Sequence, residues 1–205
     1  SKQDYGSKTD IKLLSELQNK ELEFTYKPDK DDFNENYSDS VSGDIYGKQT
    51  YEFSNEFVQG TKKIETPFSP TPLIYNSGNP CAIIPAIKSN EPKTNLRVLY
   101  FGGVIDCQSG SWNFARWVAG SPVITNYTTY PYAGHLDNPI NPTIDLNFGE
   151  NPFSYYSGQQ TETNATLYNR FWANYVQQIS EGKLVTMSMN LNEVDISFIL
   201  NTLSQ

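Results

Sequence analysis

The only histidine of the chain, His135, is the residue on which a nucleophilic mechanism would depend. A serine or cysteine nucleophile commonly uses an imidazole as its general base, so any Ser-His-Asp or Cys-His arrangement here would include His135. The residue lies in the sequence Ala-Gly-His-Leu-Asp at positions 133–137, and the chain contains no G-x-S-x-G motif. We therefore expect a hydrogen-bonded structural histidine in a turn rather than a catalytic base.

Three acidic residues in an aromatic-rich region, Asp137, Asp145 and Glu150, raise glycoside hydrolysis as a second possible chemistry. That reaction uses a pair of carboxyl groups that flank the bond to be cleaved. However, the alternation of apolar and polar residues over 143–148 predicts a strand, with Asp145 on its solvent-facing side or bonded to a neighbouring turn. We therefore expect no catalytic residue and predict that the chain is not an enzyme.

The acidic segment at 29–36 has some of the oxygen spacing of a calcium loop. Residues 32, 34 and 36 offer positions 1, 3 and 5, but Tyr37 replaces the required glycine and Gly43 replaces the closing glutamate. These substitutions exclude an EF-hand. The alternatives are a solvated acidic loop, which we expect, and a looser calcium site built from Asp29, Asp31 and Asp32. No metal site is predicted.

Two cysteines, Cys81 and Cys107, are too few for a disulfide framework, and their spacing does not fit a zinc site. The alternatives are a single disulfide between the two and two free, partly buried thiols, and the free thiols are the expected state for a protein that is assembled in a cytosol. No other group of residues indicates a bound organic molecule. The sequence therefore predicts no cofactor.

A cluster of large aromatic residues in the middle of the chain has three possible roles. Such side chains serve as a platform for sugars, as anchors of a protein interface, or as part of a core. Core packing is the expected role. The residues are Trp112, Phe114, Trp117, Tyr127, Tyr130 and Tyr132.

Composition limits the classes of partner. The 205 residues carry a formal net charge of −8, whereas a nucleic-acid phosphate backbone requires clustered lysine and arginine, so we expect no nucleic-acid partner. No run approaches the roughly 20 apolar residues that cross a bilayer, so we also expect no membrane insertion. Aromatic residues make up 14% of the chain, which is enough large apolar surface to predict a folded protein.

Period-2 alternation predicts most of the regular structure. Leu22, Phe24 and Tyr26 alternate with polar residues and indicate a strand with one solvent-facing side. Less regular apolar runs predict further strands at 51–58, 81–87, 96–105 and 183–190. Gly102 and Gly103 are expected to mark a bulge in one of them.

The remaining segments are predicted to be irregular. Residues 27–44 are expected to form an extended acidic loop, and the proline-rich residues 67–80 an extended surface segment. Residues 121–152 carry several prolines and no helical period, which predicts loops or very short strands. The end of the chain, 193–203, is expected to be a strand followed by a turn, or a short helix.

A single strong helical period occurs near the C-terminus. The predicted helix covers about residues 165–181, with Gly182 as its end, and its apolar face is expected to pack against the sheet through Phe171, Trp172, Tyr175 and Ile179. The predicted fold is therefore mainly β (α+β), an antiparallel sheet sandwich or distorted barrel with one substantial helix. With no linker or repeat, residues 1–205 are expected to form a single β-rich structural module.

Several segments resemble large virion proteins of crAss-like and related Bacteroidetes and marine tailed phages. The most specific is the string Tyr-Pro-Tyr-Ala-Gly-His-Leu-Asp-Asn-Pro at residues 130–139. The resemblance covers roughly residues 20–195. The other segments that carry it are 22–33, 43–47, 57–65, 68–73, 99–103, 145–149 and 168–175.

The resemblance implies a non-catalytic structural role in a tail, hub or baseplate-like assembly of the virion. The implied partners are other virion tail proteins and copies of the chain itself, and the implied location is the virion, assembled in the host cytoplasm. It also implies that the chain is a fragment or domain of a larger protein, and no catalytic residue carries over from it. The alternative from another class is a glycan-binding module of a Bacteroidetes-type cell surface protein.

Overall fold

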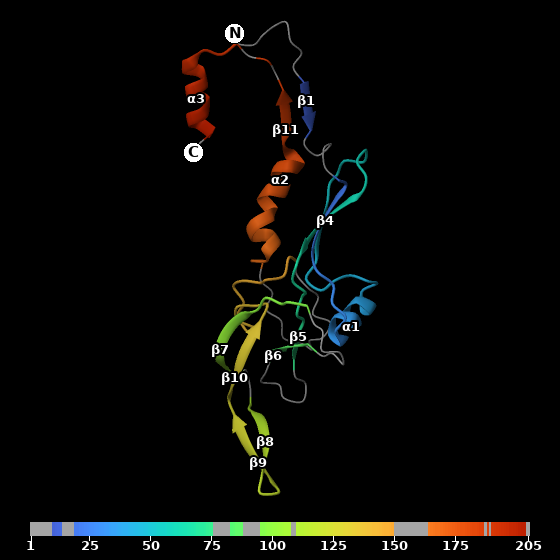
Figure 1. Cartoon of the computed structure of the whole chain (residues 1–205), viewed down its shortest axis with the longest axis vertical. Helices are drawn as coiled ribbons and strands as arrows, with labels where there is room; N and C mark the ends of the chain where they lie inside the picture. The colour runs from blue at the N-terminus through green and yellow to red at the C-terminus, as the bar shows by residue number, and fades with distance from the viewer. Residues whose placement is uncertain are drawn as a thin grey trace.

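The structure is a computed structural model. It describes residues 10–13, 19–75, 83–87, 95–107, 110–149, 164–186, 188 and 190–203. The fold is mainly β, with three helices, and this part of the prediction is confirmed. Among the described residues the strands form five small sheets rather than a closed barrel. The elements are arranged along one long axis, with a paired ribbon of strands near each end (Figure 1).

The largest sheet has three strands in the order β3 (Gln49–Glu52), β2 (Glu21–Tyr26) and β4 (Thr61–Thr66). The predicted alternation is confirmed, because Leu22, Phe24 and Tyr26 are all buried. Strand β2 is antiparallel to β3 but parallel to β4, which differs from the fully antiparallel expectation. A parallel pair requires a long crossover connection, which here is the chain from residue 27 to residue 60 and includes β3.

The predicted C-terminal helix is present, but it begins with a π-helical turn. This turn, η2 (Tyr168–Trp172), leads into α2 (Ala173–Glu181), which ends at Gly182 as predicted. The Trp172 ring lies 5.1 Å from the Phe24 ring, measured between centroids. The helix therefore covers the buried side of β2.

Only part of the predicted apolar face of this helix is buried. Val176 and Ile179 are buried and Trp172 is packed against the same core, but Phe171 is 67% exposed and Tyr175 is 47% exposed. The prediction was wrong for these two residues. The small sheet covers only the side of the helix that carries Trp172 and Val176. Phe171 and Tyr175 each precede one of these residues by one position, so their side chains point about 100° away from the sheet.

A second core lies beside the first. Strand β7 (Tyr100–Asp106) pairs with β10 (Thr129–Gly134), and β5 (Leu73–Tyr75) pairs with β6 (Ile83–Pro85). The register of β7 and β10 skips Gly102, so the predicted bulge is confirmed. A side chain at Gly102 would lie 2.7 Å from the Tyr132 ring, which explains the glycine. The buried residues of this core are Leu73, Tyr130, Tyr132 and Leu136.

The prediction of an extended loop at residues 27–44 was wrong in part, because the helix α1 (Asp32–Ser40) occupies its centre. Asp31 caps the helix, since its carboxylate accepts a hydrogen bond from the Asn34 backbone N–H at 3.4 Å. Asn34 and Tyr37 are buried, which fixes the helix on the body of the protein. Residues 27–44 therefore do not form an arm.

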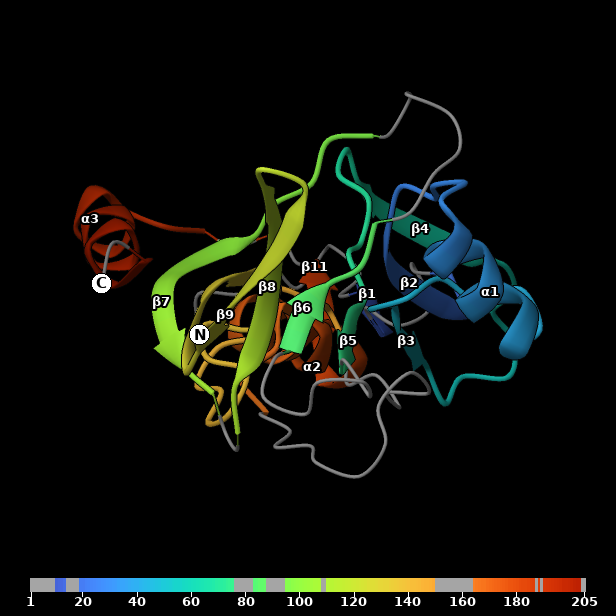
Figure 2. The ribbon, with the colours of Figure 1, turned by 90° about the horizontal axis from the view of Figure 1, so that it is seen from below.

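Two pairs of strands and one helix lie outside the two cores. The hairpin β8 (Trp112–Val118) and β9 (Ser121–Tyr127) projects at one end, and β1 (Asp10–Leu13) pairs with β11 (Lys183–Thr186) towards the other (Figure 1). The helix α3 (Glu193–Leu203) stands apart from the other elements in both views (Figure 2). None of the described helices is both long and apolar enough to cross a membrane.

Buried tyrosine hydroxyls connect the loops to the cores. The Tyr26 hydroxyl donates to the Leu146 carbonyl, and the Tyr132 hydroxyl donates to the Leu136 carbonyl at 2.9 Å. Burial raises the pKa of Tyr26, Tyr46 and Tyr132 above the usual value of about 10. Asp145 raises the pKa of Tyr26 and Tyr46 further, and Tyr130 has the same effect on Tyr132.

These raised pKa values predict loss of stability at alkaline pH. The folded state keeps the three phenols protonated, whereas the unfolded state releases their protons above about pH 10. The contribution of these tyrosines to the free energy of unfolding should therefore be constant below that pH and fall above it, by up to about 1.4 kcal/mol per pH unit for each tyrosine. Urea unfolding measured at a series of pH values tests this, with Tyr26→Phe expected to give a shallower fall. The same slope in both proteins would contradict the assignment to Tyr26.

Candidate interaction surface

His135 lies in a closed polar network rather than in an open site. Its side chain is buried, with Nδ1 2.7 Å from Asp145 Oδ1 and Nε2 3.0 Å from the Tyr46 hydroxyl. Asn147 Nδ2 lies 3.1 Å from the same Nδ1. Because both ring nitrogens are engaged by buried partners, the network holds the loop at 135–147 against the body. A substrate would have to displace these partners to reach the ring.

Of the three predicted carboxylates, Asp145 belongs to this network and Asp137 does not. Asp137 accepts hydrogen bonds from the Thr143 and Ile144 backbone N–H groups at 2.8 and 3.0 Å and closes a turn. Burial works to raise the pKa of the Asp137 carboxyl, but hydrogen bonds from the Thr143 hydroxyl and from these backbone groups outweigh it and lower the pKa. Asp145 is buried, which contradicts the first of its two predicted positions, and it accepts a hydrogen bond from the Asn147 backbone N–H at 2.8 Å, which agrees with the second, a bond to a neighbouring turn. Glu150 lies outside the described residues.

The alternative calcium site is already occupied by an arginine of the chain. Arg97 Nη2 lies 2.6 Å from Asp29 Oδ2 and 2.7 Å from Asp31 Oδ1. A cation at this position would have to displace the guanidinium group. Within the described part of the chain, no cluster of three or more histidine, cysteine, aspartate or glutamate side chains is arranged to hold a metal ion. Cys107 is half-buried, and Cys81 lies outside the described part.

The feature that stands out is the projecting β8–β9 ribbon. Its strands pair along their full length, from Trp112 opposite Tyr127 to Val118 opposite Ser121. The turn consists of Ala119 and Gly120, with φ of 49° and 82°. Two successive residues with positive φ are typical of the type I′ turn, which matches the twist of a two-stranded hairpin. The ribbon is therefore a regular element and not a loop.

Both faces of this ribbon carry exposed apolar side chains. Alternation places Phe114 and Val123 on one face, and Trp117 and Ile124 on the other. Trp117 is 74% exposed, Ile124 63% and Phe114 51%. The expectation that Trp117 and Phe114 belong to the core was wrong.

The root of the ribbon is fixed to the second core. The Trp112 indole N–H donates to the Thr129 carbonyl at 2.6 Å, and its ring stacks on Tyr127 with centroids 5.2 Å apart. Trp112 also packs against the cluster that contains Tyr130 and Tyr132. The predicted core role is therefore confirmed for Trp112, Tyr130 and Tyr132. The exposed part of the ribbon thus has a firm base.

The charge of the ribbon contrasts with that of the whole chain. Arg116 is the only charged residue between positions 112 and 127, although the chain has a net charge of −8. Protein interfaces are enriched in aromatic residues and arginine, and are depleted of lysine and acidic residues. The ribbon has this composition.

Comparison with protein-family models, with curated proteins and with solved structures finds no significant match. The chemical character of the ribbon is therefore the main guide to what it binds. An isolated two-stranded hairpin is only marginally stable in water, and one with apolar side chains on both faces gains from a partner on each. In the described structure, β8 and β9 pair only with each other.

Sequence reasoning missed the ribbon although a local signal was present. The dipeptide Ala119-Gly120 separates two seven-residue runs rich in β-branched and aromatic residues. This is the pattern of a hairpin, but Asn-Gly and Asp-Gly are its usual turn residues. Proline at 122 also argued against a strand, and it is tolerated here because the ribbon has two free edges.

Proposed function

We propose that the chain is a non-catalytic structural module of a tailed-phage virion, part of a tail, hub or baseplate-like assembly. The observation that carries the proposal is the exposure of Trp117, Ile124 and Phe114 on the two faces of the projecting ribbon. Monomeric soluble proteins rarely leave a large contiguous apolar patch in water, and such patches mark interaction sites. The resemblance of residues 130–139 to virion proteins supports a virion as the assembly to which the chain belongs.

Other exposed apolar side chains support a protein that works among neighbours. Phe101 on β7 is 83% exposed, and Phe198 on α3 is 72% exposed. These residues and the ribbon lie on different elements, so a single partner on one face would leave part of the apolar surface uncovered. Repeated copies in a ring make heterologous contacts through two different surfaces of each copy. In this proposal the partners are copies of the chain and other tail proteins, and the location is the virion.

The second candidate function, binding of glycans at a cell surface, is favoured by the exposed ring of Trp117 alone. Aromatic faces stack on sugars, but a sugar site also requires polar groups to bond the hydroxyls. Next to Trp117 this face presents Ala115, Pro122 and Ile124, which offer no such side-chain group, and its polar side chains, Asn113 and Asn126, lie four residues further along the two strands. Protein is therefore the better partner for this surface.

The first test of the proposal changes the ribbon without changing the core. Trp117→Thr and Ile124→Thr keep residues with a high preference for strands and remove the apolar surface. We expect the free energy of unfolding to change by less than about 0.5 kcal/mol, because both residues are exposed. Incorporation of the parent protein into particles should fall by about 10-fold or more, the effect of losing an interface anchor.

Mass spectrometry and electron microscopy of purified particles measure the incorporation. Phe57→Thr is the matched control, because Phe57 is 97% exposed and lies away from the ribbon. Normal incorporation of the Trp117→Thr, Ile124→Thr protein would contradict the role of the ribbon. Absence of the unaltered protein from particles, together with saturable binding of a defined oligosaccharide, would favour the glycan-binding function instead.

A further inference from the structure

The two edges of the projecting β8–β9 ribbon are not equivalent. The two-residue turn makes Val118 and Ser121 a hydrogen-bonded pair, because these residues flank it. Hydrogen-bonded and non-hydrogen-bonded pairs then alternate along the two antiparallel strands. The non-hydrogen-bonded positions are 113, 115 and 117 on β8 and 122, 124 and 126 on β9. Their backbone N–H and C=O groups point outwards, away from the ribbon.

Of these two edges, the β8 edge has the complete set of outward hydrogen-bonding groups. Pro122 has no N–H, and its ring stands at the β9 edge, where it obstructs a further strand. Asn113, Ala115 and Trp117 each offer a donor and an acceptor at the β8 edge. Residues 113–118 are all exposed, and within the described structure β8 pairs with β9 alone (Figure 1). The outer edge of β8 is therefore open to another strand.

This edge is complementary to itself. Around a two-fold axis at Ala115, the centre of the strand, all seven residues of β8 oppose β8 of a second copy in antiparallel order. Ala115 then faces the partner's Ala115, and Asn113 faces the partner's Trp117. Each of these pairs joins two outward positions, so its residues exchange both N–H···O bonds. No outward group of the edge remains without a partner in this register.

The single charge of the ribbon favours the same register. Arg116 lies opposite the partner's Phe114 in a non-hydrogen-bonded pair, where side chains approach most closely. A guanidinium group and an aromatic ring attract each other at this separation. An axis at residue 116 would instead place two arginines directly opposite each other, which is repulsive. An axis at residue 114 or 116 would also shorten the paired length.

Pairing through β8 also extends the apolar faces of the ribbon. A two-fold axis perpendicular to the strands and through the sheet keeps equivalent side chains on the same side. Trp117 and Ile124 of both copies then share one face, and Phe114 and Val123 of both copies share the other. A two-stranded ribbon is only marginally stable in water, whereas a sheet of three or more strands with an apolar face is more stable.

We propose that the open edge of β8 pairs with β8 of a second copy of this chain, antiparallel and centred on Ala115, so that two ribbons form one sheet. This pairing rests on the function proposed above for the ribbon, and it gives that function a partner and a backbone contact. The contact is isologous and closes on itself. It leaves the exposed Phe101 and Phe198 available for contacts with other neighbours.

The first test is sedimentation equilibrium of the chain at concentrations up to about 1 mM, which requires no particles. We expect a monomer–dimer equilibrium. Ala115→Pro should weaken the dimer by about 10-fold or more, because it removes the N–H at the axis and none of the hydrogen bonds within the ribbon. Asn126→Pro is the matched control, because it removes an outward N–H from the β9 edge. It should leave the dissociation constant within about twofold.

The second test measures the register by disulfide cross-linking and does not depend on proline. Ala115→Cys should form an intermolecular disulfide on mild oxidation, because the Cα atoms of a hydrogen-bonded pair lie about 5.5 Å apart. Asn113→Cys should not, since the two residues at position 113 would be about 14 Å apart along the strands. Mass spectrometry of the linked peptides separates these products from any that involve Cys81 or Cys107.

The outcomes separate this contact from the function on which it rests. Absence of a dimer up to about 1 mM, equal weakening by the two proline variants, or a disulfide at position 113 in place of 115 would overturn the pairing. Loss of the Ala115→Pro protein from particles, with a chain that stays monomeric, would overturn it in favour of a strand from another protein. A dimer with the expected register, formed by a protein that is absent from particles, would support the pairing and contradict the virion function alone.

Discussion

Replacing Phe24 with alanine should lower the free energy of unfolding by about 3–5 kcal/mol, the usual cost of emptying a buried aromatic site. Phe24 has no exposed surface and occupies the centre of the first core. Its ring centroid lies 5.1 Å from that of Trp172, 5.2 Å from that of Tyr168 and 6.0 Å from that of Phe148. The substitution therefore removes contacts that join β2, η2 and the loop before residue 149.

The size of this effect depends on burial and not on the residue type. Phe57→Ala makes the same chemical change at a side chain that is 97% exposed, and we expect it to cost less than about 0.5 kcal/mol. Urea unfolding of both variants measures the difference. A cost below about 1 kcal/mol for Phe24→Ala would mean that the helix does not pack on β2 in solution.

The strand that contains Phe24 was predictable because its signal is local. One solvent-facing side requires alternation of apolar and polar residues, and the sequence at Leu22, Phe24 and Tyr26 follows it, although Thr25 on the other side is also buried. The signal that predicts the end of α2 is also local, because it is the glycine at position 182 itself. The burial of Trp172 but not Phe171 was not predictable, since it depends on the width of the sheet surface that the helix meets.

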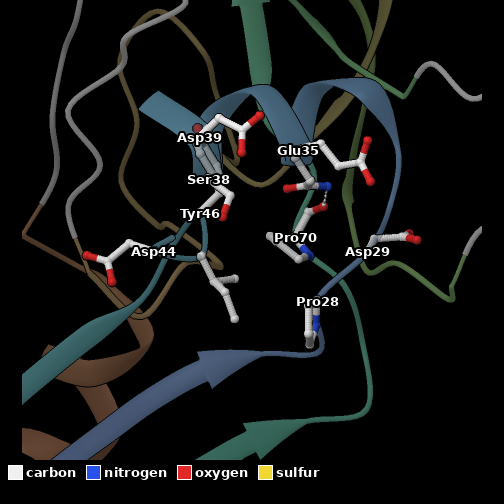
Figure 3. Close-up of a pocket in the computed structure, with 10 residues that line it drawn as sticks. Pro28, Asp29, Glu35, Ser38, Asp39, Asp44, Tyr46 and Pro70 are labelled. Carbon is white, nitrogen blue, oxygen red and sulfur yellow. Dashed lines mark hydrogen bonds between the residues drawn. The ribbon is translucent and has the colours of Figure 1, made fainter. Parts of the chain in front are cut away.

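The helix α1 illustrates what sequence patterns omit. Residues 32–40 are mostly polar, and Phe33 and Tyr37 are the only large apolar residues among them, too few to indicate a helical period. The helix is held by tertiary contacts instead, including the bond from Asn34 Nδ2 to the Pro70 carbonyl and the ion pair between Asp31 and Arg97. A pocket of about 400 Å³ beside α1 could not be predicted either, because its walls come from segments that are separated in sequence (Figure 3).

The ribbon was missed for a different reason. A run of Trp, Phe, Val and Ile normally indicates burial, and the exposure of Trp117 and Ile124 contradicts that rule within the single chain. A partner that covers the two faces of the ribbon would bury these side chains, in agreement with the rule. Exposed apolar residues on a regular element therefore carry information about function that the same residues in a core would not.

Replacing Arg97 with methionine should also cause a large loss in the free energy of unfolding. The guanidinium group lies between two carboxylates that have little access to solvent, with Asp29 7% and Asp31 0% exposed in their side chains. Arg97 Nη1 also donates to the Pro70 carbonyl at 2.6 Å. Methionine replaces the unbranched aliphatic part of the side chain and removes the charge and all of these hydrogen bonds.

The expected loss is about 3–5 kcal/mol in the free energy of unfolding, because two buried carboxylates lose the cation that compensates them. Arg116→Met is the matched control, since Arg116 is exposed on the ribbon, and it should cost less than about 0.5 kcal/mol. Denaturant unfolding of the two variants gives the comparison. Equal costs would show that Asp29 and Asp31 do not depend on Arg97.

A second substitution separates uncompensated charge from lost packing. Asp31→Asn keeps a side-chain oxygen that can still cap α1, but it removes one of the two buried negative charges. In the Arg97→Met background it should therefore recover part of the stability, whereas in the unaltered protein it should reduce it. This opposite sign distinguishes the two causes, because a defect in packing alone would be unaffected by the charge at Asp31. Recovery would establish that Arg97 is present to neutralise the carboxylates that begin α1.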